Sequence, residues 1–384
     1  MGYFNSKRLK DARKFRRLTL DDLAIKIGTS RQAISQYENG TEPQSIEITK
    51  KISDALGFPI SFFLEADNVR DVQFGSTQFR SLFTATKKDL NSLEIKARYL
   101  ARIQYELREY IQFPELNLPE MKTVIMPNTD IERVSSMLRD YWSLGEEPIP
   151  DMVSLLERNG IIVSELATDV KSVDAFSQYN VIDGIGYFCV ILGTDKNCFV
   201  RRQFDCAHEL AHIILHNPFQ DNDDLTREEY HNMETEANKF ASAFLLPKNA
   251  FSSDIAKFGF RLNVFIELKK KWKVSISSMI MRARDLEIIN TNQFQYLIRT
   301  ISAKGWKKDE PLDDILEVRH PKFLKKAISL LLFNDVLTGK EIVDLFAKSG
   351  CSLSKNVIEE LLGLEPDVLL YDEGKVIQFP RLRQ

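Results

Sequence analysis

The feature that most constrains this 384-residue chain is the pentapeptide H-E-L-A-H at residues 208–212. It lies in an apolar run from Phe204 to Leu215 that predicts a helix. Histidines four positions apart in a helix are about 6 Å apart along the axis and about 40° apart around it, so both imidazoles leave one face and can bind the same ion. Glu209 then lies beside the ion, where a carboxylate can accept a proton from water that the metal acidifies.

Coincidence is the alternative to a metal site. The chain has only five histidines, and chance would produce this pattern in about one chain of such composition in 200. His208 and His212 stand among apolar neighbours, so burying them without a partner would cost free energy. A metal ion that both imidazoles bind is therefore the favoured interpretation, and the pattern is half of a zinc site.

A catalytic zinc site needs a third protein ligand and an open position for water. A second amphipathic helix, residues 234–247, supplies the candidate, and we predict Glu236 because it is in register with Phe240 and Phe244. The other acidic residues nearby are expected to form a solvated face; they are Glu228, Glu229 and Glu234.

Two further histidines lie near this region. His216 is eight residues beyond His208, about 12 Å along the same straight helix, which is too far to complete the coordination. We expect His216 to be structural or to support a ligand from outside the coordination shell. His231 is the alternative third ligand.

The run from Arg201 to His216, followed by E-A-N-K-F-A-S-A-F-L-L-P at residues 236–247, resembles the ImmA/IrrE family of zinc metallopeptidases. The similarity spans about residues 120–295. Ala211 stands where small residues such as Gly often precede the second histidine, which is a mild departure. The resemblance implies that Zn²⁺ is the cofactor, that its ligands are His208, His212 and Glu236, and that Glu209 is the general base.

The N-terminus carries an independent signal. Residues 20–27 have one apolar face, Gly28 provides a tight turn, and Ser30 can cap a following helix that Ile34 and Tyr37 hold against the core. This pattern predicts a helix-turn-helix. Residues 5–64 as a whole resemble the XRE family of phage-repressor-like DNA-binding domains.

Charge and side-chain type agree with DNA binding. Residues 1–64 contain eleven Lys and Arg against seven Asp and Glu, although the whole chain has a net charge of −3, and seven of those cations fall between Lys7 and Arg17. Arg and Gln suit bidentate contacts with base edges in the major groove. The residues expected to face outward on the second helix of the motif are Arg31, Gln32, Ser35 and Gln36.

The resemblance adds two expectations for this domain. Arg31, Gln32 and Gln36 match base-reading positions of the phage repressors, and Arg13 with Glu38 matches an internal ion pair of that family, so Arg13 is not assigned to DNA. The partner implied is a double-stranded DNA operator, and a homodimer would suit such a partner. A protein-interaction module of the same fold is the alternative.

Length and pattern predict a multidomain protein, mainly α with a small sheet. We expect an all-α helix-turn-helix domain (1–64), a connector and long helix (65–118), an α+β zincin-like peptidase domain (119–295) and a mostly helical C-terminal region (296–384). Strands are expected near residues 161–164, 172–176, 185–192 and 198–201, and a hairpin near 368–371 and 375–379.

The remaining composition is that of an ordinary globular protein. No signal peptide and no apolar run that could span a bilayer is evident, so we expect a cytoplasmic protein without a membrane partner. The four cysteines have neither C-x-x-C spacing nor the density of a disulfide framework, and they are expected to be reduced; they are Cys189, Cys198, Cys206 and Cys351.

Together these features predict a transcriptional regulator with a zinc-dependent endopeptidase domain. The resemblance implies a protein substrate, namely a repressor of the XRE type or an antitoxin, and the fusion adds the chain's own connector, residues 65–88, as a substrate. The alternative is a non-enzymatic repressor or antitoxin whose peptidase-like domain holds a structural or sensing zinc. A weaker alternative is a phage-defence or mobile-element component that acts through a toxin.

Overall fold

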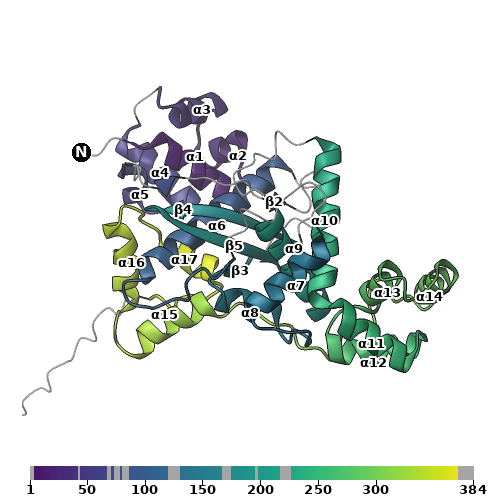
Figure 1. Cartoon of the computed structure of the whole chain (residues 1–384). Helices are drawn as coiled ribbons and strands as arrows, with labels where there is room; N and C mark the ends of the chain where they lie inside the picture. The colour runs from purple at the N-terminus through teal and green to yellow at the C-terminus, as the bar shows by residue number, and fades with distance from the viewer. Residues whose placement is uncertain are drawn as a thin grey trace, which may run out of the picture. The chain divides into compact units, whose positions relative to one another are not determined.

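The computed structural model describes residues 4–41, 44–66, 71–72, 78–79, 86–119, 130–166, 174–194, 198–216 and 226–370 (Figure 1). The chain divides into two compact units. The first contains Met1–Asp71, Lys87–Gln112 and Lys322–Gln384, and the second contains Val72–Thr86 and Phe113–Pro321. The C-terminal helices therefore belong to the same compact unit as the N-terminal domain.

The first unit is built of helices, apart from its connecting segments and Asp71 of a short strand. Five helices form the N-terminal part: α1 (Ser6–Phe15), α2 (Leu20–Ile27), α3 (Arg31–Asn39), α4 (Ile46–Leu56) and α5 (Ile60–Leu64). The long helix α6 (Lys87–Leu107) packs against α1. Three C-terminal helices complete the unit: α15 (Phe323–Phe333), α16 (Gly339–Lys348) and α17 (Lys355–Leu362).

An aromatic cluster joins α6 to the N-terminal helices. The ring centroid of Tyr99 in α6 lies 6.0–6.4 Å from those of Phe15, Phe58 and Phe62. The C-terminal helices are held by polar contacts with α6, because Arg102 donates to the Ser349 carbonyl at 2.9 Å and Lys96 pairs with Glu360 at 3.0 Å. Burial of these groups accounts for the grouping of three distant chain segments in one unit.

The second unit is built on a mixed sheet. Its long strands are β3 (Ile162–Leu166), β4 (Ala175–Ile182) and the central β5 (Ile185–Gly193), which pairs parallel to β3 and antiparallel to β4. The short strands β1 (Asp71–Val72) and β2 (Gln78–Phe79) both pair with β4, and the register of β2 places Gln78 opposite Ser177 and Phe79 opposite Phe176.

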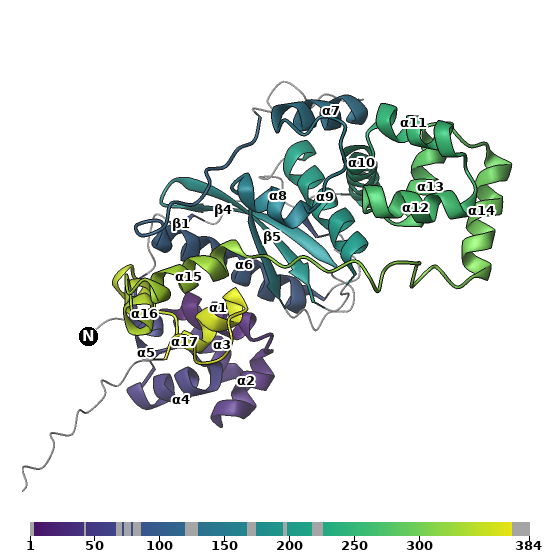
Figure 2. The same ribbon diagram turned by 90° about the horizontal axis from the view of Figure 1, so that it is seen from below.

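Helices cover this sheet and extend beyond it (Figure 2). Helix α9 (Phe199–Leu215) packs on β4 and β5, and its other sides contact α8 (Met152–Arg158) and α10 (Arg227–Leu245). Helix α7 (Ile131–Tyr141) packs on α10. Four more helices follow α10: α11 (Lys248–Phe258), α12 (Leu262–Trp272), α13 (Ile276–Asp285) and α14 (Thr291–Ala303).

Two glycines, Gly184 and Gly160, have nearly the same positive φ but different surroundings. Gly184, with φ of 79°, follows Asp183 in the two-residue turn between β4 and β5, where a positive φ is required. A Cβ there would meet nothing within 4 Å. Gly160, with φ of 78°, links α8 to β3, and a Cβ there would collide with the Glu115 backbone, whose carbonyl oxygen is 2.4 Å away.

This pair gives a stability prediction. Gly184→Ala should lower the free energy of unfolding by about 1 kcal/mol, because only backbone strain is added. Gly160→Ala should lower it by roughly 3 kcal/mol, because the Glu115 backbone must also move. Chemical denaturation of both variants measures the difference, and equal losses would contradict the close approach at Gly160.

The fold agrees with the expected class, which is mainly helical with a small sheet. The strands expected near 161–164 and 185–192 are confirmed as β3 and β5, and the one expected near 172–176 corresponds to β4, which begins at Ala175. A strand at 198–201 is wrong, because Phe199 starts α9. Val200, Gln203 and Cys206 are buried at helical spacing, which continues the apolar face of that helix toward its N-terminus.

The expected C-terminal hairpin is not formed in the part that the structure describes, where residues 366–369 form a turn. Its remaining residues, 371 and 375–379, lie outside the described residues. In the described parts of the chain no helix combines the length and apolar content needed to cross a bilayer.

Candidate metal centre and nucleic-acid interface

The H-E-L-A-H motif lies in the C-terminal half of α9, which is buried along most of its length. His208 and Glu209 are fully buried and His212 is nearly so. The neighbouring helix α10 is started by a capping box between Thr226 and Glu229, which fixes its first turn. Ala237 and Ala241 are small and buried, and α10 packs closely along α9.

Three potential ligands converge between these helices. The Nε2 atoms of His208 and His212 are 3.1 Å apart, and the Glu234 carboxylate oxygens are 3.5 Å from the first and 3.4 Å from the second. Bonds of about 2.0–2.1 Å to a tetrahedral zinc place neighbouring ligand atoms about 3.3–3.4 Å apart. The observed separations therefore fit three ligands of one zinc ion, and two imidazoles with a carboxylate are a donor set typical of zinc.

The structure places Glu234, not Glu236, in this group. The Glu234 side chain is 15% exposed, so its assignment to a solvated face is wrong, whereas Glu236 is 52% exposed and contacts His216. The reason is helical register: residues 234, 237, 238 and 241 share the face of α10 toward α9. Phe240 and Phe244, on which the choice of Glu236 relied, stack on each other, and Phe244 packs against Trp142.

Electrostatics favour a charged ligand at Glu234. Without a bound metal, burial would raise the pKa of its carboxyl, but hydrogen bonds from the Nε2 atoms of His208 and His212 outweigh burial and lower the pKa to about 2. The group is therefore an anion at neutral pH, as a zinc ligand must be. His231 is exposed and does not belong to the group.

Each histidine of the motif has an outer hydrogen-bond partner. His208 Nδ1 lies 3.2 Å from Asn238 Oδ1, and the amide orientation is set because Asn238 Nδ2 donates to the Glu234 carbonyl at 2.8 Å. His212 Nδ1 lies 2.8 Å from His216 Nδ1. Burial lowers the pKa of His216, which keeps that imidazole neutral at pH 7. Such partners orient the rings of metal-binding histidines.

Asn238 and Glu234 were missed by the sequence reasoning. Their four-residue spacing, with Ala237 and Ala241 on the same face, was the available signal, because small residues mark where two helices approach closely. The prediction of Glu236 relied on the aromatic residues at Phe240 and Phe244, which do not lie on the face of α10 that meets α9.

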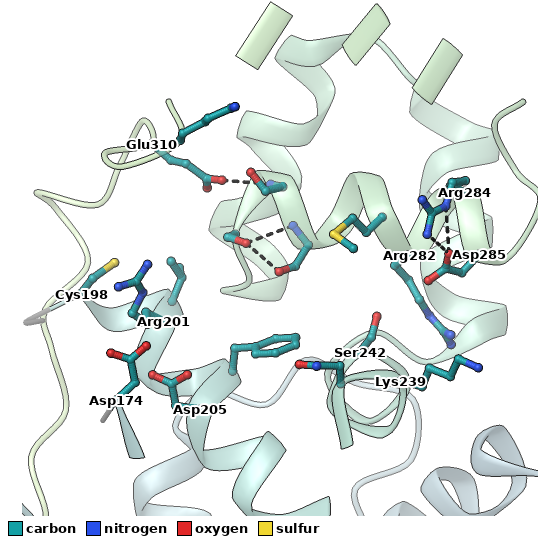
Figure 3. A pocket seen from close by; sticks show the side chains of 18 of the residues that line it. Asp174, Cys198, Arg201, Asp205, Lys239, Ser242, Arg282, Arg284, Asp285 and Glu310 are labelled. Atoms are coloured by element: carbon teal, nitrogen blue, oxygen red, sulfur yellow. Dashed lines mark hydrogen bonds and ion pairs between the residues drawn. The ribbon is translucent and has the colours of Figure 1, made fainter. Parts of the chain in front are cut away.

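A cleft of about 920 Å³ lies beside α9 and α10 (Figure 3), and His208, Glu209, His212 and Glu234 are not among the residues that line it. Residues of α9 and α10 line one side, including Asn238, the partner of His208, and α13 with the segment Trp306–Asp313 lines the other. Figure 3 shows Asp174, Arg201 and Asp205 gathered at one end of the cleft. A cleft of this size can accommodate several residues of a peptide, and Asn238 connects it with the candidate ligand His208.

The N-terminal helices form the expected helix-turn-helix. Thr19 and Asp22 form a capping box at the start of α2, Gly28 ends α2 with φ of 72°, and Ser30 caps α3 by accepting from the Ala33 amide. The ion pair expected between Arg13 and Glu38 is confirmed, with Arg13 Nη2 at 2.8 Å from Glu38 Oε2.

Helix α3 presents the side chains assigned to DNA. Arg31 and Gln32 are exposed at its N-terminus, with 68% of the Arg31 side chain accessible, and Ser35 and Gln36 are partly exposed one turn later. Helices of this kind enter the major groove by their N-terminal residues. The position of these four residues is compatible with base contacts.

The sequence contains seven cations between Lys7 and Arg17, in α1 and directly after it, whose charge was expected to suit DNA phosphates. Four of the seven form ion pairs with carboxylates of the same unit: Arg8 with Glu65, Arg13 with Glu38, Arg16 with Glu360 and Arg17 with Asp89. Lys14 donates to Asn91 at 2.6 Å and is half buried. Lys7 and Lys10 are the exposed cations of the run. Most of its charge therefore stabilises the unit, and these two lysines are the candidates for phosphate contacts.

Comparison with known proteins identifies both regions. Residues 9–63 match the helix-turn-helix family model, and residues 160–284 match the model of the IrrE N-terminal-like domain, a peptidase family. A putative HTH-type transcriptional regulatory protein of Halobacterium salinarum is 31% identical over 110 residues, which cover 28% of this chain and 32% of the relative.

An uncharacterized protein of Rickettsia prowazekii is 22% identical over 208 residues, which cover 48% of this chain and 33% of the relative. The matched part of the chain thus spans about a third of the length of each of these relatives. The chain joins a helix-turn-helix domain of the XRE type to a peptidase-family domain of the IrrE/ImmA type.

Proposed function

We propose that this protein is a DNA-binding transcriptional regulator whose second unit is a zinc-dependent endopeptidase. The observation that carries the proposal is the convergence of His208, His212 and Glu234 at zinc-ligand spacing, with Glu209 next to His208 in sequence. A purely structural site has no need of a carboxylate at Glu209. The match of residues 160–284 to a peptidase family supports the same conclusion.

Different residues of the chain have different roles in the proposed hydrolysis. When bound by His208, His212 and Glu234, zinc would supply a Lewis acid that polarises the scissile carbonyl and acidifies the attacking water. Glu209 accepts the proton of that water and transfers it to the leaving amine. Because Glu209 is fully buried, its exchange of protons with bulk solvent is restricted during the reaction.

The substrate is proposed to be a polypeptide segment in extended conformation, from a repressor of the XRE type, an antitoxin or this chain. One observation favours the chain's own connector. Gln78 and Phe79 pair with β4 at Ser177 and Phe176, two to three residues after Asp174, which lines the cleft. Strand β2 of the connector thus pairs with β4 through backbone hydrogen bonds, which is also how extended peptides bind to the edge of a sheet.

A synthetic peptide covering residues 65–88 tests this substrate directly. The zinc-loaded protein should cut it at one bond, and Glu209→Gln should leave it intact, with chromatography and mass spectrometry as the readout. An uncut peptide together with a cut XRE-type repressor would assign the activity to another protein as substrate, and the connector would be excluded.

The DNA-binding part is proposed to read a double-stranded operator through Arg31, Gln32, Ser35 and Gln36 of α3. Arg31→Ala and Gln32→Ala should each reduce discrimination between operator and random DNA, because a bidentate base contact contributes about 1–3 kcal/mol. Titrations by fluorescence anisotropy measure this, with the operator found by selection from random DNA. Equal losses on both DNAs would contradict this recognition face.

Lys7 and Lys10 provide the contrasting prediction. Lys7→Ala and Lys10→Ala should each weaken binding to all DNA sequences alike, because a phosphate charge is no longer neutralised, and should reduce the slope of binding against salt by about 1. Lys14→Ala is the matched control, because Lys14 donates to Asn91. Its salt slope should equal that of the wild-type protein.

A further inference from the structure

Three histidines follow one another at four-residue spacing, His208 and His212 in α9 and His216 at its C-cap, and their rings are in contact. The ring centroids of His208 and His212 are 4.8 Å apart, and those of His212 and His216 are 4.9 Å apart. His216 is buried, and its Nε2 lies 3.4 Å from Oε2 of Glu236. A continuous chain of contacts therefore runs from the candidate metal ligands to a carboxylate that is half exposed.

If His212 is a zinc ligand, the direction of the hydrogen bonds from His212 to His216 and from His216 to Glu236 is fixed. Its Nε2 faces His208 and Glu234, so its lone pair must be free for the cation and its proton must be on Nδ1. His212 Nδ1 then donates to His216 Nδ1 at 2.8 Å. His216, left with its proton on Nε2, donates to Glu236.

The two ligand histidines thus have outer partners of different kinds. His208 Nδ1 donates to the neutral amide oxygen of Asn238 at 3.2 Å, which is a weak and uncharged acceptor. His212 donates at the shorter distance of 2.8 Å to an imidazole that is itself hydrogen-bonded to a carboxylate. Acceptors of this second kind raise the basicity of the ligand nitrogen and hold the ring in place.

We propose that His216 and Glu236 are positioning residues that fix the Nδ1–H tautomer and the ring orientation of His212, and that they strengthen zinc binding without touching the ion. The inference rests on the proposed function only in taking zinc as the cation. It gives Glu236 a role at the outer end of the chain, where its exposure and its distance from the ligand group have a physical explanation.

Competition with a chromophoric chelator measures the effect on zinc affinity. His216→Phe removes the acceptor but retains the bulk, and it should weaken zinc binding by about 10- to 100-fold. His216→Gln retains an acceptor oxygen and should recover most of that loss. Glu236→Ala should weaken binding by about two- to tenfold, because its contact is longer and half exposed.

Proton-detected ¹⁵N spectra show which ring nitrogen of each histidine carries the proton. This protonation pattern would not depend on His216 and Glu236 if their role were only to support the packing. The chain has five histidines, so the signals can be assigned by substitution. Zinc-loaded wild-type protein should show His212 protonated on Nδ1 and His216 protonated on Nε2. In Glu236→Ala the His216 Nε2 proton should exchange faster with water, and circular dichroism should confirm that the variant is folded.

The outcomes separate this inference from the proposed function. If wild-type protein binds zinc and His216→Phe and Glu236→Ala bind it equally tightly, the positioning role is refuted and the zinc site stands. If the wild-type protein takes up no zinc, both are refuted. A His216→Gln variant that binds zinc no better than a folded His216→Phe variant would also contradict the role of the acceptor.

Discussion

Glu234→Ala is expected to lower zinc affinity by about 100- to 1,000-fold. Apparent binding energies of about 10–16 kcal/mol at four-ligand zinc sites correspond to about 2.5–4 kcal/mol for each ligand. Glu234 is the carboxylate whose oxygens lie 3.4–3.5 Å from both imidazole Nε2 atoms, and its low pKa keeps it charged. Elemental analysis after dialysis and chelator competition measure the loss.

Glu236→Ala is the matched control on the same helix, two residues away. It should retain about one equivalent of zinc, with the smaller loss in affinity that an outer partner predicts. The double variant His208→Ala, His212→Ala should bind none. Full metal content in Glu234→Ala with loss of metal in Glu236→Ala would contradict the assignment drawn from the structure and restore the one drawn from the sequence.

Glu209→Gln is expected to lower the rate of peptide hydrolysis by about 100- to 10,000-fold, the range for removal of a general base. Gln has the same shape, so the buried site should keep its packing, but an amide cannot accept the proton of the attacking water. Zinc content and operator binding should equal those of the wild-type protein, which separates loss of chemistry from loss of fold. The rate is measured from progress curves with the connector peptide as substrate, or with a repressor that the wild-type protein cleaves.

The motif and the domain types could be predicted because they depend on local spacing. H-E-L-A-H specifies its geometry within one turn of helix, and the turn at Gly28 with the cap at Ser30 specifies the helix-turn-helix in the same way. The pair between Arg13 and Glu38 followed from family resemblance and is confirmed.

Properties that depend on packing between distant segments could not be predicted. The choice between Glu234 and Glu236 depends on which face of α10 meets α9, and both faces are apolar enough to be buried. The ion pairs of Arg8 and Arg16 involve Glu65 and Glu360, and no local pattern indicates that the C-terminal helices return to the N-terminal unit. Charge counted along the sequence therefore overestimated the charge available to DNA.

The most direct test of the central claim, that the second unit hydrolyses a peptide bond, is intact-mass spectrometry. Zinc-loaded wild-type chain and its Glu209→Gln variant are incubated alone and with XRE-type repressors, with operator DNA present. We expect two fragments whose masses sum to the substrate plus one water, from the wild-type reaction only. Identical intact masses in both reactions for every substrate, with zinc bound, would contradict the peptidase and leave a regulator with a structural or sensing zinc.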